Sequence, residues 1–333
     1  MPTSRPRARW RAGLLALAAS TALAGTAASA ADVSTPNVSG LAWRSGATGG
    51  GFPCLAQLRG RALDARTTFV GHDSFPAMVT KSGRMQRDAA QAPLLVVSQP
   101  LLPSSNKRQF AQCAAGAFDG SFRQIGANLK AAGAKGTVVR LGWEANIGSD
   151  SHPWGVDDAG QVAAYKACWR RAAAALKAGG PGLLLEWTSA KKTQNKALSI
   201  AAMYPGDDVV DVVGVHYYDS GPEKSTQAIW DQSYKATFNG NPWGLGTWLA
   251  FAKAHGKRLG IAEWGLWRRD GLSAAQADDP IYIANMYRFF RDNAGSVAYE
   301  TYFNAMADQH LLCPSTQFPR ATATYKALWH AGT

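Results

Sequence analysis

The sequence predicts an α/β fold in which a parallel sheet closes into a (β/α)8, or TIM, barrel within a single domain. Short apolar runs alternate with segments of helical periodicity about eight times along the 333 residues, without an internal repeat. This alternation is typical of parallel sheets. The alternative is an open, doubly wound sheet, which usually carries a G-x-G-x-x-G turn after a strand. No such turn is found, so the barrel is favoured.

The expected strands are short apolar runs, and most end at or just before a polar residue or a glycine. They cover 41–43, 67–70, 94–98, 138–144, 183–187, 209–215, 259–263 and 297–303. The expected helices cover 54–63, 119–132, 160–177, 245–255, 281–293 and 321–329. In the helix over 119–132, Phe122, Ile125 and Leu129 recur at helical spacing, and Gly133 marks its end.

The first thirty residues have the pattern of a secretory signal peptide. A basic start is followed by an apolar stretch over 13–25 and by the small-residue site Ala28-Ser29-Ala30. The apolar stretch is too short to span a membrane. We therefore predict that residues 1–30 are removed and that residues 31–333 form the barrel domain. The mature protein is expected to be secreted, extracellular or periplasmic, without a membrane segment.

The chain is basic, with a formal net charge of +12 that falls to +8 without the four arginines of its first thirty residues. This charge suits an acidic polysaccharide or a negative cell surface, while the simpler explanation is solubility. The basic residues form only short clusters, Lys191-Lys192 and Arg268-Arg269. No nucleic-acid-binding motif is present. We expect a monomer with no nucleic-acid partner.

The four cysteines predict two disulfides, because an exported chain with an even count usually pairs them. Cys113 and Cys168 lie on or next to the helices that flank the fourth strand, and Cys54 and Cys313 follow the first and eighth strands. Each pair of elements is adjacent in a closed barrel, so we predict Cys113–Cys168 and Cys54–Cys313. Neither C-x-x-C nor a histidine cluster is present, and we expect no metal and no cofactor.

Two strand ends carry a glutamate next to an aromatic residue. The run 137–146 reaches Glu144, and the run 258–265 reaches Glu263. Barrel enzymes place their chemistry at this end of the strands. By strand count the two glutamates end strands four and seven, which face each other across the barrel mouth. Two carboxyl groups about 5–5.5 Å apart are what a retaining glycosidase needs. Glu186 also ends a strand, but it would crowd Glu144 rather than face it, so we expect a structural role.

These segments resemble glycoside hydrolase family 26, a clan A family whose best-known members are β-mannanases. The resemblance rests on the run Val139-Arg140-Leu141-Gly142-Trp143-Glu144-Ala145-Asn146, on Pro153-Trp154-Gly155, on 211–219 and on 261–265, and it extends over about 116–329. It implies that Glu144 is the acid/base, that Glu263 is the nucleophile and that Tyr218 supports the nucleophile.

Two positions depart from the family pattern. The family has a histidine where this chain has Trp143, and usually an aspartate where it has His216. The missing histidine would lie near the sugar at the cleavage site. A substrate other than mannan, and a closely related clan A family, are therefore alternatives.

Polar and aromatic residues around these strand ends are candidates for substrate binding. They are Arg140, Trp143, Asn146, Trp154, His216, Tyr218 and Trp264. Arg140 would help to keep Glu263 ionised, unless it only forms a structural ion pair. Trp154 and Trp264 are expected to stack on sugar rings. Further candidates for lining the cleft are His72, Asp73, His152, Trp187 and Trp267.

Together these observations predict a secreted, retaining β-glycoside hydrolase that cleaves β-mannan or another β-glycan by double displacement, with cleavage expected within the polysaccharide chain. One alternative is a barrel that binds glycan without cleaving it. Another is a clan A glycosidase that acts on the cell's own exopolysaccharide. An esterase is less well supported, because no G-x-S-x-G nucleophile motif is found.

Overall fold

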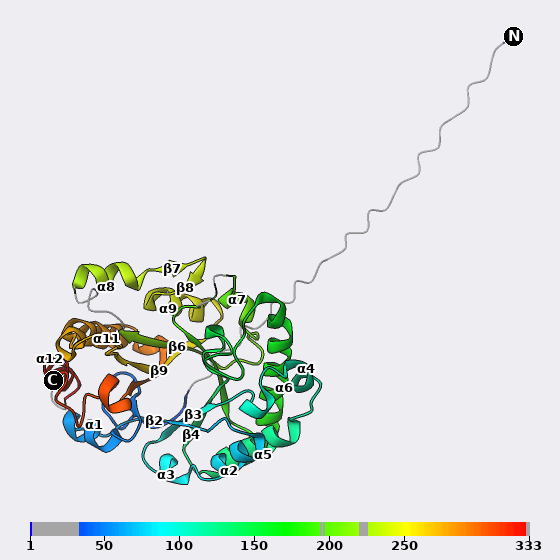
Figure 1. Ribbon diagram of the computed structural model, residues 1–333, viewed down its shortest axis with the longest axis horizontal. Helices are drawn as coiled ribbons and strands as arrows, with labels where there is room; N and C mark the ends of the chain where they lie inside the picture. Colours follow the sequence, from blue (N-terminus) through cyan, green and yellow to red (C-terminus); the bar gives the residue numbers. More distant parts are fainter. Residues whose placement is uncertain (2–32, 194, 196, 220–225, 331–333) are drawn as a thin grey trace.

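The computed structural model describes residues 1, 33–193, 195, 197–219 and 226–330. The predicted signal peptide lies outside the described residues, apart from Met1. A closed barrel of eight parallel strands stands at the centre (Figure 1), in the order β1-β10-β9-β6-β5-β4-β3-β2. The strands are β1 (Ser45–Thr48), β2 (Ala65–Phe69), β3 (Leu94–Gln99), β4 (Gly136–Leu141), β5 (Leu184–Ala190), β6 (Val212–Asp219), β9 (Arg258–Leu266) and β10 (Val297–Phe303).

Helices surround the barrel and connect successive strands (Figure 1). They are α1 (Phe52–Arg59), α2 (Phe75–Ser82), α3 (Gln86–Ala89), α4 (Phe110–Ala114), α5 (Asp119–Ala131), α6 (Val162–Gly179), α7 (Ile200–Met203), α8 (Gln227–Tyr234), α9 (Leu245–Ala254), α10 (Ala274–Ala277), α11 (Pro280–Asp292) and α12 (Pro319–Trp329). A short antiparallel hairpin of β7 (Thr237–Phe238) and β8 (Asn241–Pro242) precedes α9.

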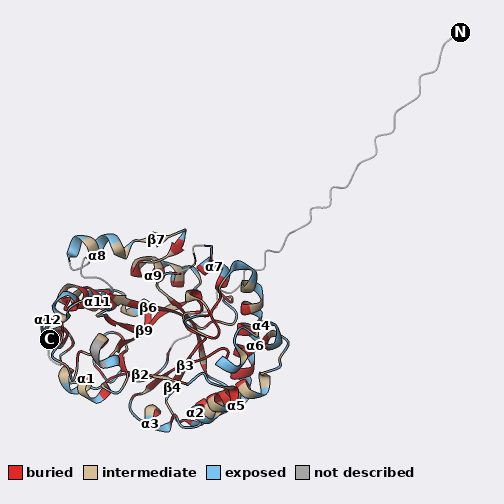
Figure 2. Ribbon diagram, viewed as in Figure 1, coloured by how far each residue is buried: buried red, intermediate tan, exposed pale blue. Residues whose placement is uncertain are grey.

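The apolar side chains form two separate clusters, because successive residues of a strand point to opposite faces of the sheet. The smaller cluster fills the barrel interior with residues such as Val96, Val138 and Val212. The larger cluster lies between the sheet and the helices. Figure 2 shows buried strands at the centre and exposed faces on the outer helices.

The (β/α)8 fold class is confirmed, and seven of the eight expected strands overlap observed ones. The expected strand over 41–43 is wrong. The first strand is β1, and Trp43 instead packs into the outer core and donates a hydrogen bond to Glu300 at 3.2 Å. The strand expected to continue to Glu144 ends at Leu141. Short helices that carry little periodic signal, such as α3 and α7, were not predicted.

Both predicted disulfides are present. Cys113 of α4 pairs with Cys168 of α6, and Cys54 of α1 pairs with Cys313 after β10. The second bridge joins residues 259 positions apart, so it links the start of the barrel to its last unit. Among the described helices, none is both long and apolar enough to cross a membrane.

Candidate active site

A pocket of ≈ 430 Å³ opens at the carboxyl ends of the strands. Its lining consists of Glu144, Ile147, Ala190, Lys191, Lys192, His216, Tyr218, Glu263, Trp267, Phe303, Met306, Gln309 and His310. The two glutamates singled out in the sequence therefore share one cavity, as do two of the predicted binding residues, His216 and Tyr218.

Glu144 is presented by the turn that follows β4. Gly142 and Glu144 both have left-handed backbone conformations, with φ of 58° and 54°. Glycine adopts this conformation freely, whereas a glutamate pays on the order of 1–3 kcal/mol for it. The amide of Glu144 donates a hydrogen bond to the carbonyl oxygen of Thr188 on β5 at 2.9 Å, which anchors the turn. Such strain is most often kept where it orients a functional side chain.

Glu263 is aimed into the pocket by an extra residue in β9. Gly214 and His216 of β6 pair with Gly260 and Glu263 of β9, so one residue of β6 lies between the paired positions where β9 has two. This β-bulge breaks the alternation of faces. The Glu263 carboxylate accepts hydrogen bonds from Arg140 at 3.0 Å and from the Tyr218 hydroxyl at 2.9 Å. Both oxygens of Glu263 therefore accept a hydrogen bond, which fixes the orientation of the carboxylate.

His216 lies between the two carboxylates. Its Nδ1 atom is 2.8 Å from Oε1 of Glu144, and its Nε2 atom is 3.3 Å from Oε1 of Glu263. Since both contacts use one imidazole ring, the nearest carboxylate oxygens are at most about 8 Å apart, within reach of a two-carboxylate mechanism. Nε2 also contacts the Arg140 guanidinium, which can only donate.

The pKa of the Glu144 carboxyl is held below its ordinary value. Burial raises this pKa, but the charge of His216 and the hydrogen bonds from His152 and His216 lower it by more. His152 Nε2 lies 3.4 Å from Oε2 of Glu144. Burial also raises the pKa of Tyr218 well above its ordinary value, and the neighbouring Glu263 charge adds to this. The phenol therefore keeps its proton and remains a donor to Glu263.

A buried charged layer lies directly beneath the pocket. Arg140 and Glu186 are both fully buried, with Arg140 Nε 3.6 Å from the Glu186 carboxylate. That carboxylate accepts hydrogen bonds from Thr188 and Tyr299, each at 2.6 Å. Burial raises the pKa of Glu186, against the lowering effect of the Arg140 charge. Glu186 is outside the pocket lining, in agreement with the structural role expected for it.

Two glycines make room for the Glu186 carboxylate. A Cβ atom at Gly214 would lie 2.3 Å from one carboxylate oxygen, and a Cβ atom at Gly260 would lie 2.4 Å from the other. Both distances are far below van der Waals contact. Neither glycine has a positive φ, so space rather than backbone conformation requires them.

The expectation that Trp154 and Trp264 stack on sugar is contradicted, because both side chains are 0% exposed. Trp154 donates to the carbonyl oxygen of Trp143 at 2.7 Å and packs against that ring. Trp264 donates to Glu300 at 2.6 Å and stacks on Trp329 in the outer core. Trp143 is itself buried, and its ring contacts Phe69 rather than the pocket. Trp187 is equally buried.

Asn146 is also absent from the lining of the pocket that contains the two glutamates. It lies in a short 3₁₀ turn, where it exchanges hydrogen bonds with the backbone of Ala190 at 2.9 and 3.1 Å. It thus ties the turn that carries Glu144 to the end of β5. His72 is exposed and contacts Ser104, and neither it nor Asp73 is part of the pocket lining.

No protein-family model and no curated protein matches this sequence. Solved structures do match. An endo-β-1,4-mannanase double mutant from Cellulomonas fimi aligns with 84% of this chain and 65% of its own, at 17% identity and a TM-score of 0.57. A GH26 β-mannanase from Bacteroides ovatus aligns over 87% and 88%, at 14% identity and a TM-score of 0.56. The catalytic domain of a Bacillus sp. JAMB-750 GH26 endo-β-1,4-mannanase aligns over 84% and 80%, at 14% and 0.53.

The chain has the fold of the family 26 β-mannanases. It spans 65% of the length of the C. fimi structure. At these identities the likeness concerns the fold, so the chemistry of this family-26-like barrel is argued from its own residues.

Several residues of the pocket were not recognised as such in the sequence. Lys191 and Lys192 were noted only as a short basic cluster, and they follow β5 directly. By contrast, Trp267, just beyond β9, was among the sequence candidates, and it lines the pocket, is 36% exposed and stacks on His310. Met306 and His310 belong to one irregular helical turn after β10. These residues all follow the carboxyl ends of β5, β9 or β10, and this position in the sequence could have identified them as pocket residues.

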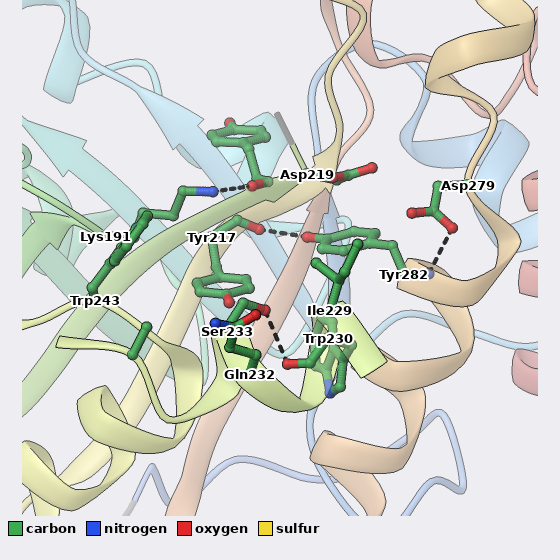
Figure 3. A pocket seen from close by; sticks show the side chains of 12 residues that line it. Lys191, Tyr217, Asp219, Ile229, Trp230, Gln232, Ser233, Trp243, Asp279 and Tyr282 are labelled. Carbon is green, nitrogen blue, oxygen red and sulfur yellow. Dashed lines mark hydrogen bonds between the residues drawn. The ribbon is translucent and has the colours of Figure 1, made fainter. Parts of the chain in front are cut away.

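A second cavity of ≈ 290 Å³ adjoins the first and shares Lys191 and Tyr218 with it (Figure 3). Tyr217, Trp230 and Tyr282 form much of its wall. It lies on the helix side of β6, because Tyr217 points away from the face that carries Tyr218. The backbone of β6 thus separates this cavity from the two carboxylates.

Proposed function

We propose that this protein is a secreted β-glycoside hydrolase that cleaves a polysaccharide with retention of configuration, using Glu144 and Glu263. The observation that carries the proposal is the convergence of these two glutamates on His216 in one pocket at the carboxyl end of a (β/α)8 barrel. The shared fold with the family 26 mannanases is consistent with it. The predicted signal peptide and the two disulfides support export.

In the first step, Glu263 attacks the anomeric carbon and forms a covalent glycosyl-enzyme. Arg140 and Tyr218 hold its carboxylate by two hydrogen bonds, so the attacking group is held in position. Glu144 gives its proton to the leaving glycosidic oxygen, and the glycosidic bond breaks.

In the second step, Glu144 takes a proton from water, and the hydroxide oxygen attacks the anomeric carbon and releases Glu263. The lowered pKa of Glu144 keeps it ionised, as a group that accepts a proton must be. His152 Nε2 lies 3.4 Å from Oε2 of Glu144 and helps to orient the carboxyl group for both proton transfers.

The proposal is tested with a panel of β-mannan, mixed-linkage glucan and xylan, in which reducing ends are measured for the wild type and for Glu263→Ala and Glu144→Ala. Loss of Glu263 is expected to abolish turnover. Loss of Glu144 is expected to spare aryl glycosides with good leaving groups, because their departure needs no proton, and azide should then restore turnover. Proton NMR of the first product identifies its anomer. An inverted first product would exclude the retaining mechanism, and binding without any turnover would favour a non-catalytic glycan-binding barrel.

The sizes of the products distinguish cleavage within the polysaccharide chain from cleavage at its ends. We propose internal cleavage, since the pocket is open at the barrel mouth, by a protein that acts as a monomer. A rapid fall in the viscosity of the substrate solution, ahead of the rise in reducing ends, is the expected result.

A further inference from the structure

Lys192 stands on the pocket wall, and none of the described residues offers an acceptor to its ammonium group. It follows β5 directly and is exposed to solvent. Its Nζ atom lies 4.9 Å from the centre of the Phe238 ring and 5.3 Å from that of Trp243. Cation–π contacts of this kind hold an ammonium in place but use none of its three N–H donors. Within the described residues, no hydrogen-bond acceptor or carboxylate contacts Lys192.

The neighbouring Lys191 is engaged differently. Its ammonium donates to the carbonyl oxygen of Tyr218 at 2.5 Å and lies 5.2 Å from the Tyr217 ring centre (Figure 3). Lys191 therefore ties the end of β5 to β6 and adds a second positive charge to the same wall. The Lys191 ammonium is thus used in a contact within the protein, whereas the Lys192 ammonium is held in position by aromatic rings and remains accessible to a ligand.

The acidic side chains in the pocket lining have other partners than Lys192. They are Glu144 and Glu263, and each is already held by other donors, His152 and His216 for the first and Arg140 and Tyr218 for the second. The chain as a whole keeps an excess of positive charge, +12 over the full sequence. A ligand that enters this pocket thus meets, beside the reacting groups, an ammonium that no carboxylate of the described residues contacts.

We infer that Lys192 binds a carboxylate on the sugar chain, so that the substrate of this pocket is an acidic β-glycan containing uronic acid. A hydrated ammonium gains little by exchanging water for a neutral hydroxyl, whereas a carboxylate forms a charge-assisted hydrogen bond with it. The two aromatic rings reduce the entropy lost on binding, since they hold the lysine in one position. This inference rests on the proposed function for the cleavage step, but its binding part can be measured separately.

The test compares matched substrates that differ only in charge. Hyaluronan and gellan, two uronate-bearing β-glycans, are used as such and after chemical reduction of their carboxyl groups to primary alcohols. Binding is measured by affinity electrophoresis of the full-length mature protein in gels that contain each polymer, and cleavage by release of reducing ends. The variants are Lys192→Met, Lys192→Arg and, as a matched control, Lys253→Met, which removes one exposed charge from the last turn of α9.

We expect the wild type to bind at least one uronate polymer about tenfold more tightly than its reduced form. Lys192→Met should abolish this difference, Lys192→Arg should keep most of it, and Lys253→Met should leave it unchanged. The difference should also shrink as salt is raised from 50 to 500 mM, because exposed charge pairs are screened.

Two results would overturn the inference: equal affinity for the charged and the reduced polymers, or an equal effect of Lys192→Met on both. Cleavage of a neutral glycan with no preference for its acidic counterpart would likewise refute it while leaving the proposed function intact. Conversely, Lys192-dependent binding of the acidic polymers without any cleavage would support the inference and reject the proposed function.

Discussion

Gly260→Ala is expected to disturb the charged layer beneath the pocket. The new Cβ atom would lie 2.4 Å from a carboxylate oxygen of Glu186 and 3.1 Å from both its carboxyl carbon and a methyl group of Val212. Glu186 cannot swing aside, because it is fully buried and is held by Thr188 and Tyr299 at 2.6 Å each. The substitution must therefore lengthen at least one of these hydrogen bonds.

The magnitude follows from two opposing effects. Overpacking costs about 1–3 kcal/mol, and weakening a hydrogen bond to a buried charged group adds about 1–2 kcal/mol. The lower entropy of the unfolded chain with alanine offsets about 0.4–1 kcal/mol of this. We therefore expect Gly260→Ala to lower the free energy of unfolding by about 1–4.5 kcal/mol, measured by urea titration at pH 7. Gly120→Ala, at an exposed site in α5 with nothing near the added atom, is the control and should be neutral or stabilising.

A double-mutant cycle identifies the cause. Glu186→Ala alone leaves Arg140 without one of its buried counter-charges and should cost about 3–5 kcal/mol. In that background Gly260→Ala should cost less than about 1 kcal/mol, because the atom it would strike is absent. If the two costs simply add, Glu186 is not what excludes a side chain at position 260, and the explanation given for both glycines is wrong.

Three further predictions concern single features. Trp267→Ala should raise KM about five- to tenfold with little change in stability, since this ring is 36% exposed on the pocket wall. Trp154→Ala, which removes a fully buried ring, should instead destabilise the fold by about 3–5 kcal/mol. The reverse pattern would contradict the assignment of the two rings. Glu144→Gln should lose stability relative to the wild type near pH 5.5, and the gap should close as the pH falls from about 4.3 towards the lowered folded-state pKa, because stability from a depressed carboxyl pKa is present above the unfolded value and lost below it; urea midpoints between pH 3 and 5.5 test this. Cys54→Ser with Cys313→Ser should cost about 2–5 kcal/mol, as bridging so distant residues restricts the unfolded chain, and an unchanged melting temperature would argue against it.

The architecture was predictable because the periodic signals are long and agree with one another. Strands such as β3 and β6 are continuous apolar runs, and α5 and α11 carry regular apolar stripes. The disulfide pairing followed from the barrel order alone. The first strand could not be placed from its residues, because β1 is Ser-Gly-Ala-Thr and contains no large apolar side chain. Its position is set by pairing with β2 and β10 rather than by local propensity.

The two catalytic candidates were found because the chemistry needs carboxylates at strand ends, but their surroundings depend on detail that the sequence does not display. The turn after β4 departs from strand geometry at Gly142, so Asn146 does not share the direction of Glu144 and serves the backbone instead. The irregular turn that carries Met306 and His310 has no periodic pattern at all. Its place in the pocket depends on tertiary contacts such as the hydrogen bond from His310 to the carbonyl oxygen of Leu266.

The mistaken assignment of Trp264 has a simple physical cause that applies to any barrel strand. If Glu263 points into the barrel mouth, the next residue must point outward, towards the helices. An aromatic residue directly after a catalytic glutamate is therefore a core residue by geometry, and Trp264 packs accordingly against α12. The same rule places Tyr218 inward beside His216, two positions apart, and Tyr217 outward. A ring that is to meet the sugar must lie beyond the end of the strand, where alternation stops, and Trp267 has that position.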